Sequence, residues 1–318
     1  MTTTPTIACL ERDSIDAPFR APATAHRWVE YPHSAPDEVV ARLQGADIAI
    51  VNKLRLGAAQ IAALPALRMV AVSATGADNV DLAACSAQGI VVSNVRGYAV
   101  DTVPEHAMTL ILALRRRLLD YVADVRAGRW ERSENFCFFD HPIADLAGST
   151  LGVVGYGDLG RGVARLCEAF GMRVLRAEQR GAAQVREGYT AFEQVLAEAD
   201  VLSLNCPLNA STRGLIGAAE LARMKPSAIL VNTSRGGLVD EAALAAALRV
   251  GRIAGAATDV LSSEPPREGN ALLVPDIPNL IVTPHVAWAS AQAMQRLADQ
   301  VIDNIDAFLA GAPRNRLA

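Results

Sequence analysis

Three ionisable side chains in the second half of the chain have types and positions suited to acid–base chemistry. Arg235 stands between an apolar run and two glycines, in the segment Asn232–Gly237. Glu264 precedes two prolines, which favour an extended loop, and His285 follows a proline at the end of another apolar run. A guanidinium binds a planar carboxylate through paired hydrogen bonds, and an imidazole can hold and release a proton near neutral pH. Together these residue types predict a site that binds a small carboxylic acid and transfers a proton.

Each of these residues also has a simpler interpretation: a surface ion pair for Arg235, a solvated loop acid for Glu264 and a structural histidine for His285. Their combination favours chemistry. Reduction of a 2-keto acid needs a cation for the carboxylate and a proton donor for the carbonyl oxygen, and a neighbouring carboxylate favours the protonated imidazole. The reaction also needs a hydride donor, which a bound nicotinamide supplies. The chain is therefore expected to contain a dinucleotide-binding segment.

The segment Leu151–Gly160, LGVVGYGDLG, has the glycine pattern of such a segment. In a dinucleotide fold Gly155 makes the tight turn, Gly157 lets the backbone approach a pyrophosphate and Gly160 lets the helix pack on its strand. The phosphates then lie at the N-terminus of a helix that begins near Asp158. Glycine-rich turns without a ligand also occur, so the motif has to be weighed with the rest of the chain.

Glu178 is expected at the end of the next strand, where an acid binds the ribose 2′-hydroxyl of NAD. The alternative is an exposed surface carboxylate. Arg176 and Arg180 flank it and could contact the 2′-phosphate of NADP, but a carboxylate at this place repels that phosphate. We therefore predict NAD as the cofactor, with NADP as the less favoured alternative.

Apolar segments alternate with helical patterns along most of the chain, which predicts an α/β protein with parallel sheets. Strands are expected at 7–10, 47–51, 68–72 and 90–92, and again at 173–176, 201–205, 228–232, 254–259 and 280–283. Helices are expected at 36–43, 58–64, 81–87, 101–117, 191–198, 241–250 and 290–309. Polar residues close nearly every strand of the second series. Because the carboxyl ends of parallel strands meet at one edge of a sheet, we expect one crevice there.

The helix expected at 101–117 is apolar nearly all round, which predicts burial between domains or subunits. The segment 128–142 that follows has neither helical nor strand periodicity, and it holds Trp130, Phe136, Phe138 and Phe139. Either it is a loop tucked under the core or it packs against a second subunit, since aromatic residues are enriched at interfaces.

The overall composition limits the function classes. With 318 residues the chain is long enough for two domains, and its formal net charge of −4 offers no basic surface for nucleic acid. Five scattered cysteines without a Cys-x-x-Cys pair favour free thiols in a reducing compartment, and no metal site is predicted. The N-terminus lacks a signal-peptide pattern and no apolar run reaches membrane-spanning length, so we expect a cytoplasmic protein with no membrane partner.

Over essentially its whole length the chain resembles the D-isomer-specific 2-hydroxyacid dehydrogenases. The resemblance rests on an ordered set of motifs: Thr75–Asp81, Pro104–His106, the Gly155 turn, Asn232–Gly237, Asp259–Pro265 and Thr283–His285. Within the family, the segments Asn94–Tyr98, Asn135–Phe139 and His285–Ser290 are most similar to the glycerate dehydrogenase and hydroxypyruvate reductase enzymes.

The resemblance implies two doubly wound parallel-sheet domains and a homodimer. A Rossmann NAD-binding domain at 101–286 would be inserted into a flavodoxin-like substrate domain at 1–100 and 287–318. The implied reaction is reduction of a small 2-keto acid, hydroxypyruvate or glyoxylate first, to the D-2-hydroxy acid with NADH, and the reverse. Arg235 would bind the substrate carboxylate and polarise the carbonyl, His285 would act as acid and base, and Glu264 would tune the histidine.

The same resemblance implies the remaining contacts. Backbone amides around Thr75 and Gly76 would complete the carboxylate site. Cofactor contacts would come from Thr102, Gly155, Gly157, Asp158, Leu159, Gly160, Glu178, Cys206, Pro207, Thr212, Thr233, Ser234, Asp259 and His285.

The chain departs from the family pattern at two positions. Glu178 stands where an aspartate is most frequent, which leaves dual NAD and NADP use open, and Asn205 replaces a histidine found in related reductases. Glu264 argues against the formate dehydrogenase branch, in which that acid is replaced. The alternatives are D-lactate, 2-ketogluconate or phosphite chemistry on the same triad, or a non-enzymatic NAD-sensing corepressor. A corepressor would need long tails or a peptide-docking surface, which the sequence does not show.

Overall fold

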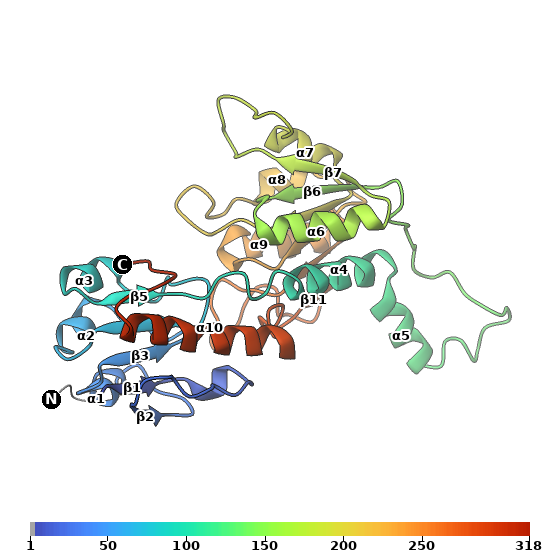
Figure 1. Ribbon diagram of the computed structural model, residues 1–318. Coiled ribbons are helices and arrows are strands. Elements are labelled where there is room, and N and C mark those ends of the chain that lie inside the picture. The colour runs from blue at the N-terminus through green and yellow to red at the C-terminus, as the bar shows by residue number, and fades with distance from the viewer. Residues whose placement is uncertain (1–3) are drawn as a thin grey trace. The chain divides into compact units, whose positions relative to one another are not determined.

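The computed structural model describes residues 4–318, which form two compact units (Figure 1). One unit ends at Tyr98 and continues in Ala289–Ala318, and the other is Ala99–Trp288. Each unit has its own sheet, and all registered strand pairs are parallel. The predicted fold class, with two parallel-sheet α/β domains, is confirmed.

The sheet of the first unit has the strand order β2-β1-β3-β4-β5. Its strands are β1 (Thr6–Cys9), β2 (Arg27–Glu30), β3 (Ile48–Val51), β4 (Met69–Val72) and β5 (Val91–Ser93). The first strand, β1, lies second in this order, with β2 on one side and β3, β4 and β5 on the other, which is the flavodoxin-like order. Every residue of β3 and β4 is buried, because helices cover both faces of a parallel sheet.

The helices of this unit are α1 (Val39–Leu43), α2 (Ala58–Ala62), α3 (Leu82–Ala87) and α10 (Ala291–Leu309), with a short 3-10 helix, η1, at Arg12–Ser14. The first three share an apolar core with β1, β3 and β4. The long α10 contacts β4 and buries Leu297, Val301 and Ile305. Ser290 begins α10 as its N-cap, since its hydroxyl accepts a hydrogen bond from the N–H of Ala293.

The sheet of the second unit has the order β11-β10-β9-β8-β6-β7. Its strands are β6 (Thr150–Val154), β7 (Arg173–Ala177), β8 (Val201–Leu204), β9 (Ile229–Asn232), β10 (Gly255–Thr258) and β11 (Leu280–Val282). The chain moves from β6 to β7 on one side and then returns to place β8 on the other side of β6. The direction of winding therefore reverses at β6, and ligands of open α/β sheets bind outside the carboxyl ends of the strands at such a point.

Two apolar cores lie on the two faces of this sheet. On one face α4 (Thr102–Arg115) and α6 (Asp158–Ala169) pack with Leu151 and Val153 of β6. On the other face α7 (Phe192–Glu198), α8 (Ala218–Arg223) and α9 (Glu241–Arg249) pack with Val154 and with β8 and β9. A second 3-10 helix, η2 (Gly236–Leu238), follows β9. Gly162 lets α6 approach α4 closely, because a Cβ at this position would come within 2.5 Å of Pro104.

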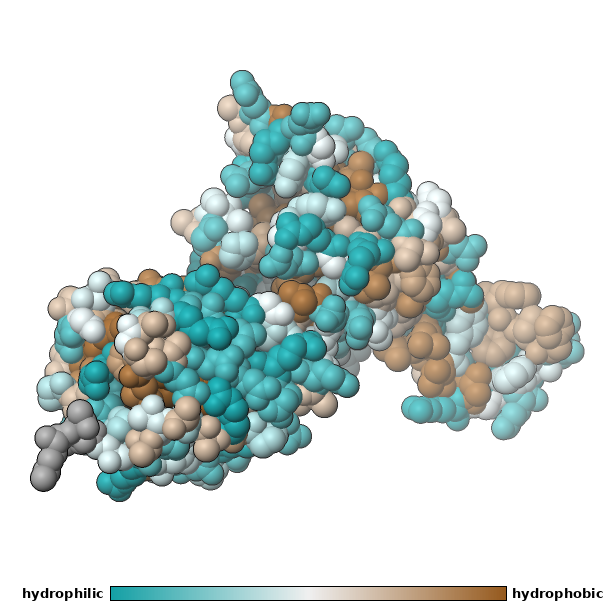
Figure 2. Space-filling model, in the orientation of Figure 1, coloured by the Kyte–Doolittle hydropathy of each residue, from teal (hydrophilic) through white to brown (hydrophobic). Residues whose placement is uncertain are grey.

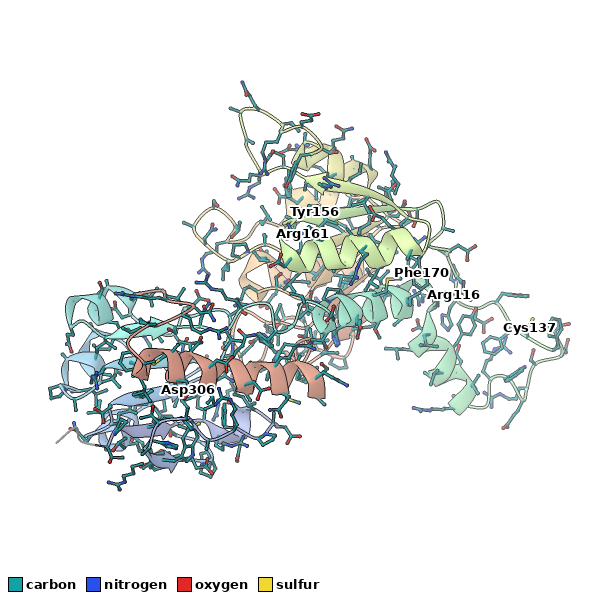
Figure 3. The ribbon with its side chains drawn as sticks, in the orientation of Figure 1. Arg116, Cys137, Tyr156, Arg161, Phe170 and Asp306 are labelled. Carbon is teal, nitrogen blue, oxygen red and sulfur yellow. The ribbon has the colours of Figure 1, made fainter. Side chains whose placement is uncertain are left out.

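The segment 118–143, called the arm below, consists of α5 (Leu118–Arg126) and the loop after it, and it extends away from the sheet of its unit (Figure 1). Figure 3 places Cys137 toward the far end of this loop. Phe136 and Phe139 are 89% and 86% exposed, and brown hydrophobic residues are visible on the arm at the right of Figure 2. The alternative of a loop tucked under the core is therefore wrong for these two residues.

Apart from the two short 3-10 helices, three elements of the described chain were not expected from the sequence: β2, α5 and α8. The edge strand β2 and the arm helix α5 contain no fully buried residue, so neither shows a strong apolar pattern. Among residues 4–318, no helix is both long and apolar enough to cross a membrane.

Candidate active site

The glycine turn lies where the winding of the second sheet reverses. Gly155, directly after β6, has a φ of +92°, and a Cβ there would come within 2.7 Å of the backbone of Asn205. Gly157 is the N-cap of α6 and has open space where its Cβ would project. A Cβ at Gly160 would overlap the carbonyl of Gly155. The three glycines thus meet the needs of a tight turn, an open approach for a pyrophosphate and close helix packing.

Two buried oxygens at the neighbouring strand ends support a ligand at this edge. Asn205 Oδ1, after β8, and Thr233 Oγ1, after β9, are buried and have no hydrogen-bond partner within the described chain. A buried polar atom without a partner is costly unless a water or a ligand reaches it. Together with the open space at Gly157, these atoms fit a polar dinucleotide lying along the strand ends.

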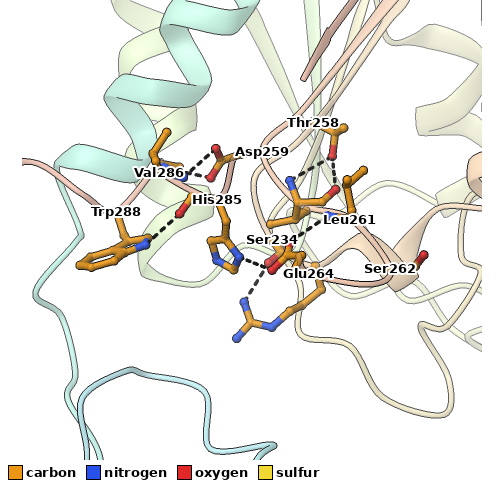
Figure 4. A network of polar contacts seen from close by, with 12 residues as sticks. Ser234, Thr258, Asp259, Leu261, Ser262, Glu264, His285, Val286 and Trp288 are labelled. Carbon is orange, nitrogen blue, oxygen red and sulfur yellow. Dashed lines mark hydrogen bonds and ion pairs between the residues drawn. The ribbon is translucent and has the colours of Figure 1, made fainter. Parts of the chain in front are cut away.

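His285 and Glu264 form a direct pair after β11 and β10. His285 Nδ1 lies 2.6 Å from Glu264 Oε2, and the other carboxylate oxygen accepts a hydrogen bond from Leu261 N at 2.8 Å (Figure 4). The side chains of His285 and Glu264 are 25% and 33% exposed. With Nδ1 turned to the carboxylate, the pair orients the imidazole and leaves Nε2 for a substrate.

Asp259 holds the backbone that carries His285. His285 has a φ of +56°, in the left-handed region, and its N–H donates to Asp259 O at 2.8 Å. The Asp259 carboxylate accepts hydrogen bonds from Val286 N at 2.9 Å and Ala287 N at 2.8 Å (Figure 4). Its oxygen Oδ1 also accepts from Thr283 Oγ1 at 2.5 Å. The carboxylate is fully buried, so its contacts are with the chain itself.

Arg235 belongs to a segment that packs against the Glu264 loop. Its Nη1 donates to Ser234 O at 2.8 Å. The next residue, Gly236, lies so close to the backbone of Leu261 that a Cβ would overlap it. Because Leu261 N is bound by Glu264, the strand ends that carry Arg235, Glu264 and His285 are joined through direct contacts.

Glu178 follows β7 as expected, but its partner was not anticipated. Its carboxylate is paired with Arg186, at 2.6 Å from Nε, and neither flanking Arg176 nor Arg180 makes this contact. Hydrogen bonds from the Arg186 guanidinium lower the pKa of Glu178 to about 2. Arg186 lies in a polar loop without periodicity, so the sequence holds no signal for it.

The other expected cofactor residues occupy the same unit. Thr102 is buried at the start of α4. Thr212 Oγ1 donates to Pro207 O at 2.7 Å and thereby closes the loop after β8. Burial raises the pKa of the Cys206 thiol to about 11, so this side chain stays a neutral thiol at physiological pH. Ser234 donates to Leu204 O at 3.0 Å, which ties the end of β9 to β8.

Thr75 and Gly76 belong to the first unit. Thr75 Oγ1 donates to Val95 O at 2.9 Å, and Asn94 Nδ2 donates to Thr75 O at 2.7 Å, so the loop after β4 is anchored to the segment after β5. Their contact with a substrate carboxylate remains a prediction. Among residues 4–318 there is no cluster of His, Cys, Asp or Glu able to hold a metal ion.

Comparison with known proteins identifies the class. The family model described as "D-isomer specific 2-hydroxyacid dehydrogenase, NAD binding domain" matches residues 108–287. The chain therefore belongs to the D-isomer specific 2-hydroxyacid dehydrogenases, and it is an oxidoreductase with an NAD-binding domain. The resemblance seen in the sequence motifs is confirmed.

Individual relatives cover nearly the whole chain. Glycerate dehydrogenase of Methylorubrum extorquens is 51% identical over 310 residues, 97% of this chain and 98% of that protein. Hydroxypyruvate reductase of Blautia hydrogenotrophica is 35% identical, over 88% of this chain and 87% of that protein. The crystal structure of an NADPH-dependent glyoxylate/hydroxypyruvate reductase from Sinorhizobium meliloti is similar with a TM-score of 0.82 and 30% identity, covering 99% of this chain and 98% of that one.

Proposed function

We propose that this enzyme reduces hydroxypyruvate or glyoxylate to the D-2-hydroxy acid with NADH, and catalyses the reverse oxidation. The observation that carries the proposal is the 2.6 Å contact between His285 Nδ1 and Glu264 Oε2, on residues that follow strands of the same parallel sheet as the glycine turn of an NAD-binding domain. The high identity to glycerate dehydrogenase and the likeness to hydroxypyruvate and glyoxylate reductases support this choice of substrate.

Each residue of the triad has a separate task. Arg235 binds the substrate carboxylate through its guanidinium and polarises the neighbouring carbonyl. His285 donates a proton from Nε2 to the carbonyl oxygen, and it removes that proton in the reverse direction. Glu264 accepts a hydrogen bond from Nδ1 and thereby orients the imidazole. The bound nicotinamide supplies the hydride.

The residues at the strand ends are proposed to hold the cofactor. The turn from Gly155 to Gly160 would receive the pyrophosphate at the N-terminus of α6. Thr233, with its unpartnered hydroxyl oxygen, would donate or accept a hydrogen bond at the end of β9. Thr102, Cys206, Pro207 and Thr212 are proposed to line the same cofactor.

A panel of 2-keto acids with NADH tests the substrate, followed by oxidation of D- and L-glycerate to fix the stereochemistry. We expect the highest kcat/KM with hydroxypyruvate or glyoxylate and oxidation of the D-isomer. Preferential reduction of pyruvate or 2-ketogluconate, or oxidation of phosphite, would instead support those alternatives. His285→Gln should lower turnover strongly and leave the Kd for NADH nearly unchanged, so unchanged hydroxypyruvate reduction would exclude the role given to His285.

We further propose that the enzyme is a homodimer formed through the arm. The arm presents exposed apolar residues, among them Leu118, Leu119, Trp130, Phe136 and Phe139, and exposed apolar patches mark interaction sites. Sedimentation should give a dimer at micromolar concentration, and a Phe136→Ser, Phe139→Ser double variant should shift the equilibrium toward monomer. A wild-type protein that sediments as a monomer would contradict the proposed dimer.

We also propose a cytoplasmic location, which the free cysteines support.

A further inference from the structure

The carboxylate of Glu178 is saturated by hydrogen bonds from its own chain. Its Oε1 accepts from Gln179 N at 2.8 Å and from Arg186 Nη2 at 2.7 Å. Its Oε2 accepts from Arg186 N at 3.1 Å and from Arg186 Nε at 2.6 Å. A carboxylate offers about four lone-pair positions in all. Glu178 therefore has no acceptor position left while Arg186 stays in place.

This saturated pair lies beside the glycine turn. Glu178 directly follows Ala177, which is the register partner of Val154 in β6, and Val154 directly precedes Gly155. In a dinucleotide fold an acid at this place meets the ribose of the adenosine and binds its 2′-hydroxyl. The position is thus the one at which cofactors with a 2′-hydroxyl and with a 2′-phosphate are told apart.

The pair also differs from a bare carboxylate in its charge. A lone acid accepts a hydrogen bond from a 2′-hydroxyl and repels a 2′-phosphate. Here a bidentate guanidinium neutralises the acid, and that guanidinium is itself accessible, since the Arg186 side chain is 57% exposed while that of Glu178 is 5% exposed. Arg186 lies over the ring of Tyr189, with its Cζ 4.0 Å from the ring centroid, which helps to hold it in place.

We propose that Arg186 sets the cofactor selectivity of this enzyme. By neutralising Glu178, it removes the repulsion that would exclude a 2′-phosphate, and it presents a cation toward that phosphate. The wild-type protein then binds NADPH as well as NADH, in spite of the acid after β7. The proposal rests on the NAD-binding role of this unit but not on the choice of 2-keto acid.

Equilibrium binding tests the proposal without any turnover. Dissociation constants for NADH and for NADPH are measured by nucleotide fluorescence for the wild type and for Arg186→Ala. We expect the wild-type Kd for NADPH to lie within about tenfold of that for NADH. In Arg186→Ala the ratio of the Kd for NADPH to the Kd for NADH should rise by about tenfold. This is the size of the repulsion between two exposed like charges that lie a few ångströms apart. A wild type that rejects NADPH by more than about a hundredfold, or a ratio in Arg186→Ala within twofold of the wild type, would overturn the proposal.

Two further variants separate charge from structure. Glu178→Gln removes the acid and keeps the guanidinium, so the ratio of the Kd for NADPH to the Kd for NADH should fall. A rise in this ratio would contradict the proposal. Arg173→Ala is the matched control, since Arg173 lies at the other end of β7 and pairs with Glu198 at 2.8 Å. In Arg173→Ala the ratio of the two dissociation constants should stay that of the wild type. If it changed as much as in Arg186→Ala, the proposal would also be overturned. Because binding is measured directly, loss of hydroxypyruvate reduction would refute only the proposed substrate and leave this test intact.

Discussion

Replacing Glu264 by glutamine tests the proposed proton-transfer pair with little change in shape. In the wild type, Oε1 accepts a hydrogen bond from Leu261 N at 2.8 Å and Oε2 lies 2.6 Å from His285 Nδ1. In the Glu264→Gln variant, the new side chain can keep its oxygen on Leu261 N only by turning its NH2 toward Nδ1. An NH2 group needs a lone pair on Nδ1, so the variant cannot keep this bond and a protonated imidazole together.

The size of the effect follows from the bond that is lost. A hydrogen bond to a charged group contributes about 1.5–3 kcal/mol. Glu264 is 33% exposed, and solvent screens part of its charge, so we expect the lower half of this range, about 1.5–2 kcal/mol. That corresponds to a loss of about 10- to 30-fold in kcat/KM for hydroxypyruvate reduction.

Steady-state kinetics with hydroxypyruvate measure this loss, and the Kd for NADH, which should stay unchanged, shows whether cofactor binding is intact. Glu241→Gln is a suitable control, because Glu241 accepts hydrogen bonds from Ser262 N at 2.7 Å and Ser262 Oγ in the same loop without contacting His285. It should stay within about twofold of the wild type. A Glu264→Gln enzyme with wild-type kcat/KM would refute the role of the carboxylate in holding the proton.

Three further changes test the surrounding residues. Arg235→Ala should raise KM for the keto acid and lower kcat, so that kcat/KM falls by about 10²–10³-fold. A normal kcat/KM would exclude the proposed binding of the substrate carboxylate by Arg235. Asp259→Asn turns an NH2 toward the N–H of Val286 or Ala287, so the free energy of unfolding, measured by urea denaturation, should fall by about 1–3 kcal/mol. Turnover should also be slower in this variant. Glu178 has a folded pKa of about 2, below its ordinary value of 4.5, so its contribution to stability is full above that ordinary value and is lost as the pH falls toward 2. The difference in stability between wild type and Arg186→Ala should shrink over the same interval, and a constant difference would contradict this.

The parallel sheets were predictable because their central strands are buried on both faces. Strands β3, β4, β8 and β9 are buried at every residue, so each appears in the sequence as a continuous apolar run. The edge strand β2 has exposed residues at both ends and half-buried residues between them, and its pattern is too weak to distinguish it from a loop. The helix α5 was not predicted for a related reason: it buries no residue within the chain, so no apolar face toward a core marks it in the sequence.

The pairing of His285 with Glu264 was predictable because both residues follow strands of one sheet, and parallel strands bring their carboxyl ends to one edge. The partner of Glu178 was not, because Arg186 reaches it through the conformation of the loop after β7. The sequence pointed only to Arg176 and Arg180, which flank Glu178, and gave no sign of the more distant Arg186. Contacts that depend on loop conformation, and not on sheet order, are the ones that sequence patterns leave open.

The hydrogen bonds around Asp259 show how the fold and the chemistry depend on one another. The Thr283 hydroxyl has a single proton, which it gives to Asp259 Oδ1 at 2.5 Å. His106 Nε2 lies 3.1 Å from the same hydroxyl oxygen, so His106 must be the donor there and must carry its proton on Nε2. His106 on α4 thus donates a hydrogen bond to Thr283, and Thr283 donates one to the Asp259 carboxylate. The hydrogen bonds of Asp259 in turn hold the left-handed backbone of His285. A buried charge that would be costly alone is stabilised by these donors, and the same hydrogen bonds hold the backbone from which the His285 imidazole, the proposed acid and base, projects.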